Sequence, residues 1–170
     1  IVGALPPPVH GMAMINKKMS TILSKKTQIH EINISPMSKI ESLQFIYKFI
    51  NFIQKILWSL IYFRRWDVLY VGLSGGLGQV YESFFIFLAR LLNKRIFIHH
   101  HSFAYINKSK IHFRILCMLG GKKCVHITLS EIMSKKLKSK YSKVKITRVI
   151  SNSAFIKVGQ FKKNIYENNL

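Results

Sequence analysis

Three consecutive histidines, His99, His100 and His101, end an apolar segment and are followed by Ser102. Side chains alternate along an extended chain, so His99 and His101 share one face and His100 lies on the other. We expect these imidazoles to be polar ligands to a substrate, with a structural role as the alternative. Zinc is disfavoured, because no Cys or acid lies at ligand spacing and only His10 could approach in three dimensions.

Two glycine-containing loops suggest a second kind of chemistry, the binding of an anion by backbone N–H groups. Residues 3–11 (GALPPPVHG) and 74–78 (SGGLG) each precede a predicted helix, whose N-terminus attracts phosphate. Neither loop is a G-x-G-x-x-G fingerprint or a P-loop, so phosphate hydrolysis is not expected and a rigid turn is the alternative for the first. The candidate binding residues are Gly3, Pro8, His10 and Gly11 in the first loop and Ser74, Gly75 and Gly76 in the second.

Catalysis by paired carboxylates has little support in the sequence. The chain has only six acidic residues, and no two of them are close together. Neither a nucleophile elbow nor an ordered Ser, His and Asp set is present. We therefore expect no hydrolase of these types.

Two kinds of apolar segment alternate along the chain. Short continuous runs predict buried strands, and longer amphipathic stretches predict helices. This alternation predicts an α/β fold, a Rossmann-like parallel β-sheet flanked by helices, with ligands at the carboxyl ends of its strands. We predict strands at 1–4, 27–34, 67–73, 95–100, 124–129 and 145–150, and helices at 12–24, 43–63, 79–92, 109–119 and 130–138.

Two of these helices allow more detailed predictions. In the helix at 12–24 one apolar side is predicted to face the core. The helix at 130–138 is predicted to begin at Ser130 as its N-cap. The apolar side of the first helix consists of Met12, Ile15, Met19, Ile22 and Leu23.

The net charge is strongly positive, since 27 Lys and Arg residues face 6 Asp and Glu residues and give +21. Such a charge suits either an anionic membrane surface or nucleic acid. Codon bias is a third explanation, because 21 of the 27 cations are Lys and Ile and Asn are also abundant. With 49% hydrophobic residues the chain is not disordered. We favour the membrane surface over nucleic acid as the partner.

The segment 43–63 supports the membrane interpretation. Its polar residues form one narrow stripe at helical spacing, and the rest of the surface is apolar and aromatic. Two central lysines argue against a spanning helix. It is predicted either to pack on the sheet or to lie in the membrane interface. Cys117 and Cys124 are expected to be free thiols of a reducing compartment.

Several segments in order resemble the amino-terminal domain of GT-B glycosyltransferases. They are GALPPPVHG at 3–11, the stretch 67–103 from DVLYVGLSGG to HHHSF, ITLSEIMSKKLKSKY at 127–141, and VISNSAF at 149–155. The chain is most similar to the retaining, family-four type of bacterial polysaccharide and O-antigen synthesis. The resemblance covers the chain from Val2 to about Phe155. It implies a domain at 1–156, with 157–170 as a linker or truncated edge.

The resemblance also implies roles for particular residues. The first loop would lie near the donor phosphates, and His101, which precedes Ser102, would reach the transferred sugar as the catalytic residue. His99 and His100 are neighbouring alternatives. Ser130 and Glu131 match a segment near the end of the domain. Asn152 is followed by Ser153 here, where the family has Gly or Ala.

The resemblance further implies an incomplete enzyme. The family's second domain binds the nucleotide-sugar donor, and we expect that domain to be missing here or supplied in trans. This chain would bind a glycan or lipid-linked acceptor at the inner, cytoplasmic face of the cell membrane, as a peripheral protein without a metal or other cofactor of its own. The alternative is a non-catalytic Rossmann-like binding module or a degenerate fragment.

Overall fold

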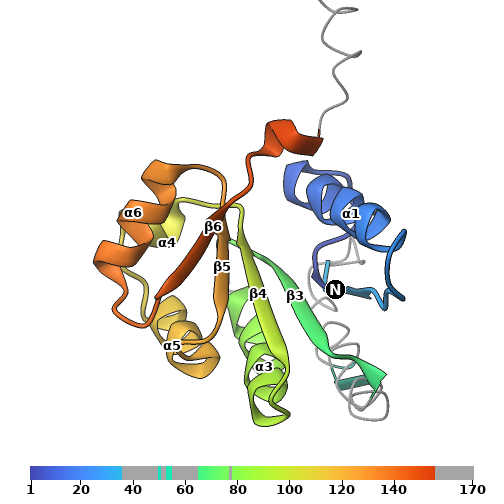
Figure 1. The fold of residues 1–170 in the computed structure, drawn as a ribbon, viewed down its shortest axis with the longest axis horizontal. Helices are drawn as coiled ribbons and strands as arrows, with labels where there is room; N and C mark the ends of the chain where they lie inside the picture. The colour runs from blue at the N-terminus through green and yellow to red at the C-terminus, as the bar shows by residue number, and fades with distance from the viewer. Residues whose placement is uncertain (36–49, 51–52, 55–64, 77, 156–170) are drawn as a thin grey trace, which may run out of the picture.

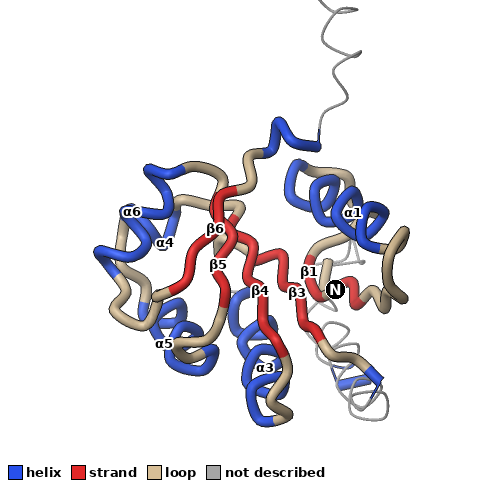
Figure 2. Tube along the Cα trace, in the orientation of Figure 1, coloured by secondary structure: helices blue, strands red, loops and turns tan. Residues whose placement is uncertain are grey.

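A computed structural model describes residues 1–35, 50, 53–54, 65–76 and 78–155 of the chain. It confirms the predicted fold class: helices flank a six-stranded, all-parallel Rossmann-like β-sheet (Figures 1 and 2). The strands are β1 (Val2–Gly3), β2 (Ile32–Asn33), β3 (Val68–Leu73), β4 (Arg95–His100), β5 (Val125–Thr128) and β6 (Ile146–Val149). The helices are α1 (Gly11–Leu23), α3 (Gly78–Leu91), α4 (Ala104–Asn107), α5 (Ile111–Gly120), α6 (Glu131–Lys140) and the 3₁₀ helix η2 (Asn152–Phe155).

The strand order is β2-β1-β3-β4-β5-β6. After β1 the chain moves outward to β2, and it then returns to the other side of β1 with β3. The strand order therefore reverses between β1 and β3, which makes this pair the topological switch point of the sheet. The two glycine-containing loops identified in the sequence follow the carboxyl ends of β1 and β3.

The sheet separates two apolar cores of unequal size. The larger core lies beneath α3, α5 and α6, and its fully buried members include Phe85, Phe113 and Leu137. The smaller core lies under α1 on the opposite face and includes Met19 and Tyr70. We refer to these two sides as the α3 face and the α1 face. Helix η2 lies beside α1 and helps to cover the α1 face (Figure 1).

The strand predicted at 27–34 is much shorter than expected, since only Ile32 and Asn33 pair with β1. Strand β1 offers only two residues for pairing. Beyond them the Asn33 side chain exchanges two hydrogen bonds of 3.1 Å with the backbone of Leu5. A side chain thus replaces the backbone ladder where β1 ends.

The predicted inner side of the first helix is wrong in part. Met19 is buried, but Ile22 is 48% exposed, and the buried stripe also contains Ala13, Asn16 and Ser20. Helix α1 is turned so that the polar Asn16 meets the sheet. The hydrophobic pattern alone could not predict this rotation, because it assigns polar residues to solvent.

Other sequence predictions agree closely with the structure. Strand β4 has the predicted bounds, and Ser130 caps α6 by accepting a hydrogen bond from the Met133 N–H at 3.2 Å. Cys117 and Cys124 are free and buried, and burial raises the pKa of both thiols to about 12. Helix α4 was not predicted as a separate element.

The predicted interfacial or sheet-packed helix at 43–63 falls outside the described residues, except for residues 50, 53 and 54, which are helical. The predicted linker at 157–170 also falls outside them. Within the described ranges, none of the helices combines the length and the hydrophobicity needed to cross a bilayer.

Candidate functional site

The candidate site lies at the switch point, where the carboxyl ends of β1 and β3 leave the sheet. Asn16 of α1 occupies the space above two glycines in these adjacent strands. A Cβ atom on Gly72 would lie 2.1 Å from Asn16 Oδ1, and one on Gly3 would lie 2.9 Å from Asn16 Nδ2. Both strands therefore need glycine here, and the glycines allow a polar side chain to reach the sheet.

Asn16 is fully buried, yet only one end of its amide is hydrogen-bonded. Its Nδ2 donates to the carbonyl oxygen of Ala4 at 2.9 Å, while Oδ1 has no partner. A buried acceptor without a partner is uncommon in proteins and costs free energy unless water or a ligand meets it. Sequence reasoning missed Asn16 and Gly72, although an Asn within an otherwise apolar helix stripe is a signal that could have been used.

The predicted loop residues around this point have different surroundings. His10 is the N-cap of α1, and its Nδ1 accepts a hydrogen bond from the Ala13 N–H at 3.4 Å. Pro8 and Gly11 are exposed, and a Cβ atom on Gly11 would meet nothing within 4 Å. Gly11 is not among the glycines with positive φ and starts α1 in an ordinary backbone conformation.

The second loop is held by the first turns of α3. The N–H of Ser74 donates to both carboxyl oxygens of Glu82, at 3.0 and 3.1 Å, and the Ser74 hydroxyl donates to the same group at 3.2 Å. Gln79 Nε2 donates to the Ser74 carbonyl at 2.8 Å, which leaves the buried Gln79 Oε1 without a partner. Burial raises the pKa of Glu82 to about 8, despite the hydrogen bonds from Ser74 that lower it.

The Ser74 N–H is therefore already engaged by a carboxyl group. A phosphate in this loop would have to compete with Glu82, which weakens the predicted anion site at Ser74. The adjacent Gly75 has another function, since a Cβ atom there would lie 2.8 Å from Ser102 Oγ. Gly75 thus allows the second loop to pack against the loop after β4. Gly76 is exposed and has open space around it.

The three histidines alternate as predicted. His99 and His101 lie on the same side, with ring centroids 4.2 Å apart, and His99 contacts Tyr70 of β3 on the α1 face. Tyr70 Oη lies 2.5 Å from His99 Nδ1. A buried phenol needs an acceptor for its proton, so we assign Tyr70 as the donor. This assignment leaves the proton of the neutral His99 imidazole on Nε2.

His99 and His101 both have an unpartnered nitrogen. His99 is fully buried, and its Nε2 has no hydrogen-bond partner; the same is true of His101 Nε2. Burial lowers the pKa of His99 to about 3 and that of His101 to about 4. Both rings are therefore neutral near pH 7. Each imidazole can therefore form a hydrogen bond with a ligand while carrying no charge.

His100 lies on the α3 face and belongs to a connected polar network. Its Nε2 lies 2.9 Å from His126 Nδ1, and its Nδ1 lies 2.9 Å from Tyr105 Oη. Tyr141 Oη in turn donates to the backbone carbonyl of Tyr105 at 2.5 Å. Burial lowers the pKa of His100 well below its ordinary value and that of His126 to about 4. This network connects β4, β5, α4 and the end of α6, and thereby fixes the loop that carries His101 and Ser102.

The remaining predicted residues, Ser102, Ser130 and Glu131, follow the carboxyl ends of β4 and β5. Ser102 Oγ accepts a hydrogen bond from the Ala104 N–H at 3.1 Å. Ser130 is engaged as an N-cap, and Glu131 is exposed in the first turn of α6. Helix η2 lies near the histidines, with the Phe155 ring 6.5 Å from the His99 ring. It is also tied to α1, because Lys18 Nζ donates to the Phe155 carbonyl at 3.1 Å.

The structure thus brings together part of the predicted set. Gly3, His99 and His101 share the α1 face with the unpredicted Asn16 and Gly72, and Gly75 contacts Ser102. Among the described residues, no group of three or more His, Cys, Asp or Glu side chains is arranged to hold a metal ion.

The chain was compared with protein-family models, with curated proteins and with solved structures, and none of them matches it. The α1 face at the switch point offers one amide and two neutral imidazoles, each with one buried polar atom that has no partner. Such groups can bind a ligand through hydrogen bonds to uncharged polar atoms.

Proposed function

We propose that this domain is the acceptor-binding half of a sugar transferase, and that the acceptor glycan binds at the switch point. The observation that carries the proposal is the set of unpartnered, uncharged polar atoms on the α1 face: Asn16 Oδ1, His99 Nε2 and His101 Nε2. Buried polar atoms are normally hydrogen-bonded, and a bound ligand is one way to satisfy them.

A sugar hydroxyl matches these atoms chemically. Each hydroxyl both donates and accepts, while Asn16 Oδ1 is an acceptor and the proton on His99 Nε2 makes it a donor. Neither imidazole carries a charge near pH 7, so the ligand needs none at this position. A neutral ligand rich in hydroxyl groups fits better than an anion.

We assign His101 to contact with the acceptor and, as the resemblance implies, with the transferred sugar where the two meet. It is only half-buried, whereas His99 behind it is fully buried, so a ligand can reach His101 more easily. The two rings are 4.2 Å apart, and His99 is held by Tyr70. His99 therefore acts as a positioning residue for His101.

The remaining parts of the proposal rest on the family resemblance and on charge. A transferase needs a nucleotide-sugar donor, and the resemblance assigns donor binding to a second domain. The net charge of +21 favours an acceptor presented at an anionic membrane surface, such as a lipid-linked glycan. A binding module without transfer activity is the alternative, and it would share the sugar site but not the donor.

The test is saturation-transfer NMR on the 170-residue chain with glucose and N-acetylglucosamine as probes. We expect signal transfer to at least one sugar and a loss of roughly tenfold in affinity for His101→Ala, because one buried hydrogen bond to a ligand is worth about 1–1.5 kcal/mol.

His112→Ala is the matched control. His112 also has a buried Nε2 without a partner, but it lies on α5, away from the switch point. Its replacement should leave sugar binding unchanged. Absence of binding to both sugars, or equal loss in the two variants, would contradict the proposal.

A further inference from the structure

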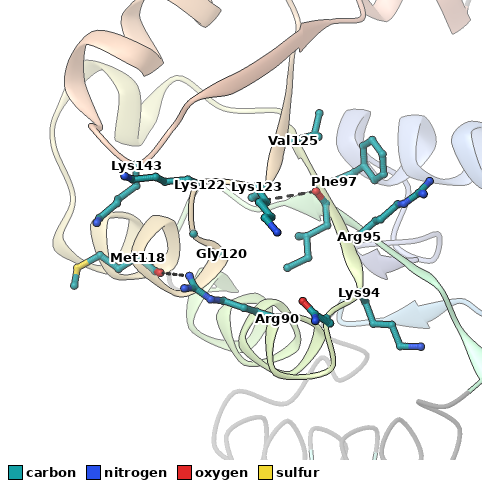
Figure 3. Close-up of a pocket in the computed structure, with 14 residues that line it drawn as sticks. Arg90, Lys94, Arg95, Phe97, Met118, Gly120, Lys122, Lys123, Val125 and Lys143 are labelled. Carbon is teal, nitrogen blue, oxygen red and sulfur yellow. Dashed lines mark hydrogen bonds between the residues drawn. The ribbon is translucent and has the colours of Figure 1, made fainter.

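Six basic residues surround a hollow at the amino-terminal ends of β4 and β5 (Figure 3). The switch point lies at the opposite, carboxyl ends of the strands. The hollow has a volume of about 750 Å³, within the range of ligand pockets. In Figure 3 one group of cations lies beside the turn after α5 and another beside the start of β4. The six residues are Arg90, Lys94, Arg95, Lys122, Lys123 and Lys143.

One of these cations organises the hollow. Arg90, in the last turn of α3, donates from Nη1 to the carbonyls of Met118 and Leu119, at 3.0 and 3.2 Å. Gly121 makes room for it, because a Cβ atom there would lie 2.2 Å from Arg90 Nη1, and its φ of +73° favours glycine. The turn after α5 is thereby tied to α3, and the next two residues, Lys122 and Lys123, project from a fixed backbone.

The positive charge of the hollow is not neutralised by the protein. No Asp or Glu lines it. The ion pair between Lys17 and Glu31 lies elsewhere, since neither residue lines the hollow. Exposed charges interact over roughly 10 Å at 0.1 M salt, so the cations repel one another unless an anion lies between them.

We propose that this hollow binds a phosphate-bearing ligand. Phosphate oxygens accept charge-assisted hydrogen bonds from Lys and Arg, and several cations around one concave surface suit a multiply charged group such as a diphosphate. The phosphate can belong to a soluble compound or to a lipid headgroup, and the experiment distinguishes them. The proposal does not rest on the sugar site, because it uses other residues at the other edge of the sheet.

The test is calorimetric titration of the full chain with sodium pyrophosphate at low ionic strength. We expect Lys122→Gln combined with Lys123→Gln to weaken binding roughly tenfold, because two exposed charged contacts to the ligand are lost together. The control combines Lys135→Gln with Lys136→Gln. These two lysines are exposed on α6, outside the hollow, and the control changes the net charge by the same amount. It should alter binding less than twofold.

Vesicles identify the source of the phosphate. Flotation with phosphatidylglycerol vesicles that is lost in the Lys122 and Lys123 variant, but kept in the control, supports a lipid headgroup. Pyrophosphate binding together with flotation that is equal in both variants supports a soluble phosphate compound. Equal loss of pyrophosphate binding in the two variants, or no binding by the unmodified chain, would overturn the proposal.

Discussion

At the carboxyl ends of the strands, buried polar groups on the two faces of the sheet differ in how fully they are hydrogen-bonded. On the α3 face, His100 has partners for both ring nitrogens, in His126 and Tyr105. On the α1 face, the next residue back, His99, has one partner in Tyr70 and one free nitrogen. Both histidines are fully buried in the same strand.

Under the proposed function, this difference separates structural roles from ligand-binding ones. A polar network whose members all have partners stabilises a fold and has nothing left to offer a ligand. An unpartnered buried atom costs stability and is retained where something else binds it. We therefore assign the His100 network to positioning the loop after β4, and the α1 face to binding.

The largest expected effect comes from His100→Leu. It would leave His126 Nδ1 and Tyr105 Oη without partners and lower the free energy of unfolding by about 2–4 kcal/mol. His99→Leu removes the partner of Tyr70 alone and should cost about 1 kcal/mol. Urea denaturation of both variants measures the difference, and equal losses would contradict the contrast between the two faces.

A smaller effect is expected at the glycine beneath Asn16. Gly72→Ala places a Cβ atom 2.1 Å from Asn16 Oδ1 and should lower the free energy of unfolding by about 2 kcal/mol, as overpacking does. Gly76→Ala is the matched control, because a Cβ atom there meets nothing within 4 Å, and it should change stability by less than about 0.5 kcal/mol.

A double variant locates the cause of that loss. Combining Gly72→Ala with Asn16→Ala removes the clashing amide, so the two losses should fall short of additivity by at least about 0.5 kcal/mol. Additive losses in urea denaturation would mean that Asn16 does not oppose the new methyl group.

A further contrast concerns the pH dependence of stability. His99 and His126 have pKa values lowered to about 3 and 4, so the unfolded chain binds more protons than the folded chain below about pH 6.5, and stability falls as the pH drops. Glu82 acts in the opposite direction. Its pKa is raised to about 8, so the folded chain holds the extra proton, and stability falls as the pH rises from about 4.5 to 8.

Glu82→Gln should therefore steepen the gain in stability between about pH 4.5 and 6.5, by up to about 1.4 kcal/mol per pH unit. Thermal denaturation across this range measures the slope. An unchanged slope would show that Glu82 is ionised in the folded chain as it is in the unfolded one.

Much of the fold could be predicted because its signals are local. The bounds of β4, the cap at Ser130 and the opposed sides of His99 and His100 follow from strand alternation and capping chemistry, which involve neighbours in sequence. The rotation of α1 could not be predicted, since it depends on glycines in β1 and β3 that meet Asn16 only in three dimensions.

By itself, the sequence determined the alternating order of strands and helices, the glycine loops at the switch point, and the excess of positive charge. The tertiary structure decided which polar groups find partners. Asn16 lies over Gly72, His100 meets His126 from the neighbouring strand, Glu82 engages Ser74, and lysines from separate turns surround one hollow. Each of these contacts depends on strand register and helix rotation. These bring together residues that are far apart in the sequence, so local sequence patterns do not predict the contacts.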